Sequence, residues 1–324
     1  MSQGGSIGWL PGGRCEMQRK NGQWSLADSL VKGAKNFLSE ANDLIDWTAI
    51  EQKLEGIYSA STGRPSYPLL TLFKALLLQQ WYGLSDPRTE EALCDSISFR
   101  RFVGLSLADT VPDHSTLSRF RAELGDRFWK LLEAFNAQLD ARGLIIRKGT
   151  LIDASFVQSS SRKRGVDGEA GSYGGQSEDN VSGYKMHAAV DQFSGLVRKV
   201  IVTSANINDT TPADELIMGD EKAVYADKAY DKHRRRKDLQ RRGIFPGLMH
   251  RANKHHPLSP KQKAFNDQIK GLRAPVERTF GILKQHYRLR RTRYVGLVRT
   301  GVQITLACIA MNIKRALVLE SAAR

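Results

Sequence analysis

Apolar residues recur at helical spacing through the first half of the chain. A helix is predicted from about residue 66, with Ser66 placed to cap it and Pro68 in its first turn. A second helix is predicted over 89–102, and Asp113 is placed to cap a third. We therefore expect residues 46–145 to form a mostly helical domain. The apolar positions of the first helix are Leu69, Leu72, Phe73, Leu76 and Leu77.

Beyond Lys148 the pattern changes to short apolar runs separated by helical segments. Several runs have the length and composition of β-strands, and two helices are predicted among them, over 209–218 and 232–242. The Gly- and Ser-rich stretch 159–182 predicts a loop between the first two strands. The second half is therefore expected to be a mixed α/β domain over 146–316. The predicted strands are Thr150–Asp153, Tyr184–Asp191, Val197–Ser204, Ala223–Ala226 and Ile244–Met249.

The two ends and one apolar stretch complete the predicted organisation. Residues 1–45 lack the apolar core of a signal peptide and are expected to form an N-terminal arm, and 317–324 a C-terminal tail. The stretch 302–313 is the most apolar late segment, but it is shorter than a helix that spans a bilayer. We expect a buried helix there. Its polar interruptions are Gln303, Thr305 and Asn312.

The charge of the chain indicates a partner. Its 324 residues include 49 Lys and Arg against 34 Asp and Glu, so the formal net charge is +15, and the isoelectric point is about 9.8. Such an excess favours polyanions, because phosphates that bind basic side chains release their counterions. Nucleic acid is therefore the first partner to expect.

Several common chemistries are not indicated by motif. Cys15, Cys94 and Cys308 lie far apart, which argues against a disulfide framework or a C-x-x-C site and fits a reducing compartment. No G-x-x-x-x-G-K-[ST] pattern is present, so ATP is not implied. The histidines at 250, 255 and 256 lack Cys partners and H-E-x-x-H spacing, and we expect them in an exposed loop.

Three carboxylates occupy positions suited to metal-dependent chemistry. Asp153 is expected to end the first strand and Asp227 the fourth, where open α/β sheets place ligand groups, while Glu277 lies on a predicted helix. Mg²⁺ prefers oxygen ligands, and two ions bridged by carboxylates stabilise both the attacking and the leaving oxygen of a phosphodiester. Strand-end acids alone are a weak indication, because any α/β chain has several.

The helix around Glu277 adds cations to the same face. At about 100° per residue, Arg273, Glu277 and Lys284 fall within roughly 40° of one another. A carboxylate flanked by two cations suits a phosphodiester, with the cations on its phosphate oxygens. Pro275 is predicted to mark the first helical turn, which would leave Arg273 just outside the helix.

These segments resemble bacterial insertion-sequence transposases of the DDE type, in the insertion-sequence-five group. The resemblance lies in Asp153, in the stretches 183–191 and 226–231, and in Val276-Glu-Arg-Thr-Phe-Gly281, and covers most of the chain. The family signature R-x3-E-x6-K matches Arg273, Glu277 and Lys284, although the Tyr expected three residues before the Arg is Lys270 here. The helical segment 65–124 resembles the N-terminal domain of this group.

The resemblance implies a ribonuclease-H-like catalytic domain with a mixed five-stranded sheet. It implies Asp153, Asp227 and Glu277 as ligands of two Mg²⁺ ions, with Mn²⁺ as a substitute. It also implies hydrolysis at transposon ends and attack of the freed 3′-hydroxyl on target DNA. The expected partners are double-stranded DNA, as terminal inverted repeats and target, and a second copy of the chain in a dimer. The expected location is the bacterial cytoplasm, on DNA.

Each acid also has an ordinary structural interpretation. Asp153 could cap a turn, and Glu277 could simply pair with Arg273 at the surface. Asp227 competes with Asp231, expected to cap the helix over 232–242, and with Asp220, expected to end the preceding helix. Asp191, expected in a tight turn, favours a structural role.

Three basic segments are candidate DNA contacts. The run 232–237 and the segment 284–293, which includes Arg290 and Arg291, flank the candidate site, and solvated surface is the alternative for both. Tyr287 and Tyr294 are interleaved with the second segment. The helix after Asp113 could be the recognition helix of a helix-turn-helix, or a plain packing helix. Its residues expected to be exposed are Ser118, Arg119 and Arg121.

Two further functions remain open from the sequence. One is a DNA-binding protein that no longer cuts, such as a repressor of related elements. The other is a nuclease on the same ribonuclease-H-like fold, which would cut DNA without joining it.

Overall fold

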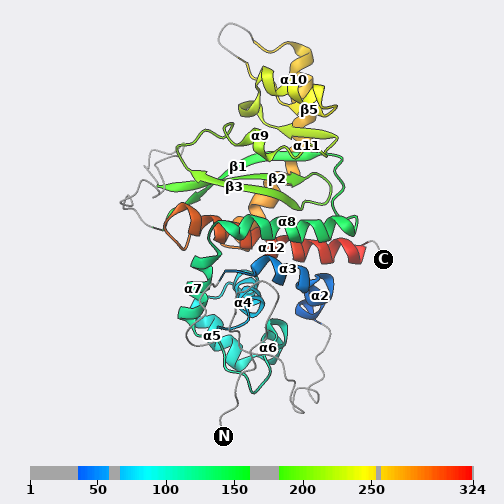
Figure 1. Cartoon of the computed structure of the whole chain (residues 1–324). Helices are drawn as coiled ribbons and strands as arrows, with labels where there is room; N and C mark the ends of the chain where they lie inside the picture. Colours follow the sequence, from blue (N-terminus) through cyan, green and yellow to red (C-terminus); the bar gives the residue numbers. More distant parts are fainter. Residues whose placement is uncertain (1–35, 58–65, 161–181, 253–256, 323–324) are drawn as a thin grey trace. The chain divides into compact units, whose positions relative to one another are not determined.

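The computed structural model describes residues 36–57, 66–160, 182–252 and 257–322 (Figure 1). It divides into two compact units, Met1–Ala134 and Phe135–Arg324. The division falls within a helix and earlier than the predicted limit at 145, because Asn136 of that helix bonds to residues of the second unit. The helices up to this point are α2 (Phe37–Leu44), α3 (Trp47–Leu54), α4 (Leu69–Tyr82), α5 (Asp86–Asp95), α6 (Ile97–Val103), α7 (His114–Leu124) and α8 (Phe128–Ala141), with the 3-10 turn η1 (Gly125–Arg127) before α8.

Helix α4 is the buried centre of the first unit. Its sequence is apolar on nearly every face, and all of its leucines except Leu70 are almost fully buried, as is Phe73, which is expected for a helix surrounded by others. The helix itself was predicted correctly, but its cap was not. The N-cap residue is Pro68, which has no side chain that accepts a hydrogen bond, and Ser66 lies before it.

The segment predicted as one helix over 89–102 is two helices, α5 and α6. Ser96 separates them: its N–H donates to the carbonyl of Ala92, and its hydroxyl accepts from the N–H of Phe99 at 3.3 Å. Ser96 therefore ends α5 and caps α6. A prediction based only on the spacing of apolar residues does not detect such a cap.

Asp113 caps α7, as predicted. Its carboxylate accepts the N–H of Thr116 at 2.7 Å and the hydroxyl of Ser115 at 2.6 Å. These bonds, led by the Ser115 hydroxyl, lower the pKa of Asp113 to about 2.

Helices lie within both predicted terminal segments. Helix α2 lies within the expected arm, and its apolar residues Leu38, Ala41 and Leu44 are buried, which is a sufficient reason for the segment to fold. The last helix continues to Ala322, through most of the expected tail. Residues 1–35 lie outside the described part of the chain.

The second unit contains a mixed five-stranded sheet in the order β3-β2-β1-β4-β5, which confirms the predicted fold class. Strand β2 is antiparallel to both of its neighbours, β1 and β3, and β4 and β5 are parallel to β1. Strands β2, β3, β4 and β5 match their predictions to within one residue at each end. The strands are β1 (Thr150–Gln158), β2 (Gly183–Asp191), β3 (Val197–Ser204), β4 (Ala223–Ala226) and β5 (Phe245–Leu248).

Strand β1 is longer than predicted, so Asp153 lies inside it and not at its end. The antiparallel partner β2 pairs with β1 over its whole length, from Thr150–Asp191 to Gln158–Gly183. This pairing satisfies the backbone of the residues after Asp153, which the local sequence pattern alone did not mark as strand.

Helices cover both faces of the sheet (Figure 1). The end of α8 and α12 (Leu297–Ala322) lie on one face, and α9 (Ala213–Leu216), the 3-10 turn η2 (Lys228–Tyr230) and α10 (His233–Arg241) on the other. There, Leu216 and Leu239 are buried against the sheet residue Val224. Helix α10 confirms the helix predicted over 232–242. The helix predicted over 209–218 is only α9, because Asn208 accepts the N–H of Thr210 in a turn.

Helix α12 is the core helix of the unit. By length and composition it could cross a membrane, and it is the one such helix in the described part of the chain, but 72% of its most apolar window is buried. A buried helix was predicted here; its 26 residues correct the expectation that it is too short to span a bilayer. Asn312 anchors it to β3, accepting the N–H of Val197 at 2.9 Å and donating to its carbonyl at 2.8 Å.

Candidate active site

Asp153 and Asp227 occupy equivalent places on neighbouring parallel strands. Strands β1 and β4 pair at Thr150–Val224 and Leu151–Tyr225, so two further residues along each strand bring Asp153 level with Asp227. Strand β4 ends at Ala226 while β1 continues, and the two acids therefore lie where the strands separate. An opening between parallel strands is where α/β sheets place ligand groups.

Asp153 is half-buried and paired with a cation. Its Oδ2 accepts a hydrogen bond from the guanidinium of Arg273 at 2.9 Å, and its Oδ1 accepts from the N–H of Ala154 at 2.8 Å. Burial raises its pKa, Arg273 opposes this, and the charges of Asp227 and Asp209 raise it further. The pKa of Asp153 is therefore above its usual value.

Arg273 comes from the long helix α11 (Pro260–Gln285). This helix begins well before Pro275, because Ser259 and Gln262 form a capping box and Pro260 fits the first turn. The prediction that Pro275 marks the first turn, with Arg273 outside the helix, is therefore wrong. Arg273 therefore lies within the helix, is 8% exposed, and pairs with Asp153 of β1.

Glu277 and Lys284 lie further along α11. Glu277 is exposed, and within the described residues its side chain has no hydrogen bond or ion pair. Lys284 is half-buried, and burial, with the charge of Arg290 beside it, lowers its pKa. The helical spacing does bring Arg273 and Glu277 near one face, but Arg273 points inward and Glu277 toward solvent.

The described residues contain no group of three His, Cys, Asp or Glu side chains that could hold a metal ion. Asp153 and Asp227 come together, and Glu277 is not gathered with them. The two aspartates offer the oxygen donors that Mg²⁺ prefers, so their chemistry fits such an ion even though the third ligand is not in place.

A fourth acid, Asp209, belongs to the surroundings of the aspartates. It follows β3, and its Oδ1 lies 2.8 Å from the ammonium of Lys185 on β2. Its charge contributes to the raised pKa of Asp153 and, after burial, to that of Tyr230. The strand-end pattern that selects Asp227 does not select Asp209, because Asp209 lies five residues beyond the end of β3.

Two families match the sequence of the chain. Residues 25–123 match the family described as "Transposase domain (DUF772)", and residues 146–313 match the "Transposase DDE domain". The second match covers more than half of the chain. The chain belongs to the transposase DDE domain family. Its second unit therefore has the ribonuclease-H-like fold of a DNA-processing enzyme family, with the five-stranded sheet described above.

One solved structure is also similar to this DDE transposase. It is described as the "Crystal structure of a pre-cleavage Mos1 transpososome". The two chains are 10% identical, with 90% of this chain and 98% of that chain covered, at a TM-score of 0.20.

The other acids of the DDE domain have structural partners. Asp191 accepts the N–H groups of Arg147 and Ser194, which confirms its turn role. Asp231 does not cap α10 as predicted; it bonds the guanidinium of Arg236 and the N–H of Arg251. Asp220 does not end a helix either. It pairs with the buried Arg198, a partner that only the sheet brings within reach.

The predicted DNA-contact residues of the transposase differ in their accessibility. Arg119 and Arg290 are exposed. Arg121 is 5% exposed and paired with Asp86, so the prediction that it is exposed is wrong; α7 turns that side chain toward α4 and α5. Arg291 is exposed, but its guanidinium donates to the carbonyls of Ser159 and Ser160.

The aromatic and histidine residues near these segments are mostly not at the surface. Tyr287 is buried, and burial raises its pKa well above the usual value, so it does not lie on a DNA-contacting surface. His250 is half-buried and not exposed as predicted, because it bonds Asn266 through its backbone N–H and carbonyl. His255, His256 and residues 161–181 of the predicted loop lie outside the described residues.

Proposed function

We propose that this chain cuts DNA at the ends of a transposable element and joins the freed 3′-hydroxyl to target DNA. The observation that carries the proposal is the pair Asp153 and Asp227 at the point where two parallel strands separate, within the segment that matches the DDE family. Glu277 is the third acid of the proposal, because its place on α11 matches the family signature.

Asp153, Asp227 and Glu277 would hold two divalent ions, Mg²⁺ or, as a substitute, Mn²⁺. Bound there, the ions would stabilise the attacking and leaving oxygens of the phosphodiester. For Glu277 to take part, the exposed carboxylate and the aspartates would have to approach one another when DNA and metal bind.

Arg273 has a positioning role in this proposal. Its ion pair orients the carboxylate of Asp153 and opposes the rise in pKa that burial causes. A deprotonated carboxylate is the form that binds a metal ion. Lys284, Arg290 and Arg291 would contact DNA phosphates, with Lys284 and Arg290 better placed than Arg291, which is already bonded to carbonyl oxygens.

The helical segment 46–145 is proposed to bind DNA and to support assembly of a dimer on the element ends. Arg119 on the exposed side of α7 is its candidate contact to the terminal inverted repeats. Membership of the insertion-sequence-five group and a location on DNA in the bacterial cytoplasm belong to the same proposal.

A DNA-binding protein that no longer cuts is the second candidate. The absence of a three-carboxylate group among the described residues favours it. Such a protein would bind the same DNA equally well with or without metal.

The test is a cleavage and joining assay. The purified chain is incubated with DNA that carries its gene and natural flanks, together with a target plasmid, in Mg²⁺ and in EDTA. The proposal expects metal-dependent 3′-ends at inverted repeats and their covalent attachment to the plasmid. Binding without new ends supports the second candidate, and new ends without attachment indicate a nuclease.

A further inference from the structure

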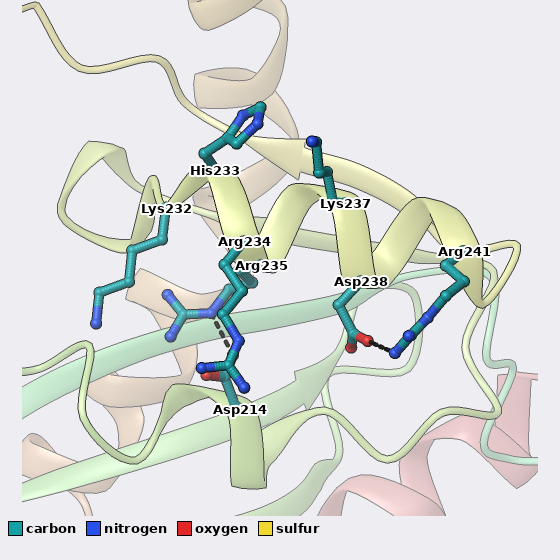
Figure 2. A pocket seen from close by; sticks show the side chains of 8 residues that line it. All are labelled: Asp214, Lys232, His233, Arg234, Arg235, Lys237, Asp238 and Arg241. Atoms are coloured by element: carbon teal, nitrogen blue, oxygen red, sulfur yellow. Dashed lines mark hydrogen bonds and ion pairs between the residues drawn. The ribbon is translucent and has the colours of Figure 1, made fainter.

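Helix α10, which follows Asp227 in the chain, lines most of a basic pocket. The pocket has a volume of about 810 Å³, and seven of its eight lining residues belong to the segment 232–241, the other being Asp214 of α9 (Figure 2). Five basic side chains face two carboxylates there, so the net charge is +3 with His233 neutral.

Two arginines of this segment fix the helix and are not available to a ligand. Arg235 is 4% exposed; it pairs with Asp214 and donates to the carbonyls of Tyr230 at 2.8 Å and Thr210 at 3.0 Å. Arg236 is held by Asp231 at 2.7 Å and by backbone carbonyls of β5. They tie α10 to the segments that follow Asp209 and Asp227.

Three cations of the same segment have no partner among the described residues. Lys232, Arg234 and Lys237 are exposed, and none has a hydrogen bond or ion pair from its side chain. Arg241 differs from them, because Asp238 beside it neutralises its charge (Figure 2). We call Lys232, Arg234 and Lys237 the α10 basic surface.

Unpaired like charges on a rigid helix repel one another and gain from a polyanion. A solvated surface is the ordinary explanation for exposed lysines. Here, however, Arg235 and Arg236 of the same helix are bonded to neighbouring segments, while the three side chains of the α10 basic surface have no partner among the described residues. The segment begins five residues after Asp227, and the bonds of Arg235 to Tyr230 and of Arg236 to Asp231 hold the start of α10 against the turn that follows this aspartate.

We propose that the α10 basic surface binds the phosphate backbone of duplex DNA beside the cleavage point. The contact is independent of sequence, because lysine and arginine meet phosphates and not base edges. This inference rests on the proposed function, since it assumes that DNA is the ligand of the DDE domain.

The test measures DNA affinity without catalysis. Full-length wild type and the variant Lys232→Gln/Arg234→Gln/Lys237→Gln are titrated, in EDTA, against a labelled duplex of arbitrary sequence at several NaCl concentrations. The control Lys222→Gln/Lys261→Gln/Lys263→Gln removes the same charge from exposed lysines of the same unit. Because these side chains have no partners, thermal unfolding should be unchanged in both variants.

Each lost phosphate contact lowers the slope of log affinity against log salt by about 0.9, so the α10 variant should lose about 2 to 3 from the wild-type slope. The control should lose less than 1. If wild type binds duplex DNA and the α10 variant keeps the wild-type slope, or loses no more than the control, the inference is overturned and the proposed function stands. If wild type does not bind duplex DNA, both fail.

Discussion

The ion pair between Arg273 and Asp153 is the central polar contact of the candidate site. Its side chains are 10% and 22% exposed, so removal of one partner leaves a poorly solvated charge on the other. We expect Arg273→Met to lower the free energy of unfolding by about 2 to 4 kcal/mol, and Arg273→Lys by less.

Urea unfolding of Arg273→Met, Asp153→Asn and the double variant measures the interaction energy between the two side chains. The double variant should be more stable than the sum of the single changes by at least about 1 kcal/mol. Additive effects would mean that the two side chains do not interact in solution.

His187 on β2 is expected to make the stability of the fold depend on pH. Its side chain is fully buried, Nε2 lies 2.8 Å from the hydroxyl of Thr203, and Nδ1 has no hydrogen-bond partner among the described residues. Burial lowers its pKa from 6.5 to about 4, with Asp209 opposing the shift and Lys185 adding to it. Between these values the unfolded chain binds more protons, so stability falls as the pH drops from about 6.5 to about 4.

The difference in the pKa of His187 between the unfolded and folded chain limits the loss in the free energy of unfolding to about 3 kcal/mol, because each pKa unit corresponds to about 1.36 kcal/mol. Chemical unfolding of wild type and His187→Gln at a series of pH values isolates it, since other titrating groups are common to both. The variant should show the flatter profile over this range, and identical profiles would exclude His187 as the cause.

At the scale of elements, one buried side chain joins α12 to the edge of the sheet. Asn312 bonds both backbone groups of Val197 and the amide of Asn136, and it is fully buried. Asn312→Leu would leave the N–H of Val197 and the Oδ1 of Asn136 buried without these bonds, while the carbonyl of Val197 keeps its bond from Asn136, and the change should cost about 2 to 4 kcal/mol.

Thermal or urea unfolding checks this cost, with Val318→Ala as the control on the same helix. Val318 is 52% exposed, so its truncation should change stability by less than about 0.5 kcal/mol. Equal effects of the two changes would contradict the anchoring role of Asn312.

The sequence predicts elements well where one local signal decides them. Strands β2, β3 and β4 are short apolar runs between turns, and Asp113 has the cap geometry that its position suggests. Predictions failed where a distant partner decides. Strand β1 continues past Asp153 because β2 pairs with it. The start of α11 is a different case, because the capping box of Ser259 and Gln262 is a local signal that the prediction missed.

At the scale of the whole molecule, we expect a few of the basic residues that give the chain its net charge of +15 to account for most of the contacts with DNA phosphates. Lys284 and Arg290 on and after α11 are candidates, whereas Arg291 is already bonded to carbonyls. We expect Lys284→Gln/Arg290→Gln to lower the salt slope of DNA binding by about 1 to 2. Fluorescence anisotropy at several salt concentrations measures this slope, and an unchanged value would remove both side chains from the DNA contact.

The site was only partly predictable from the sequence. Asp153 and Asp227 come together because their strands are adjacent and parallel, a tertiary fact that strand-end positions merely suggest. The pairing of Arg273 with Asp153 and the nearness of Asp209 depend on packing between distant segments. The family signature selects Glu277, and the structure leaves it exposed and apart from the aspartates.

Glu277 therefore gives the most direct test of the proposed chemistry. Its side chain has no hydrogen bond or ion pair in the described chain, so Glu277→Gln should leave folding and DNA binding intact and affect only the reaction. Asp267→Asn changes another exposed acid of the same helix and serves as the control.

The measurement maps every new 3′-end on DNA that carries the gene and its flanks, in Mg²⁺, for wild type and both variants. We expect ends at inverted repeats with wild type and Asp267→Asn, and at least a hundredfold fewer with Glu277→Gln, since loss of a metal-binding carboxylate costs on the order of several kcal/mol in the transition state. Cleavage by a folded Glu277→Gln at the wild-type rate would contradict the three-carboxylate mechanism.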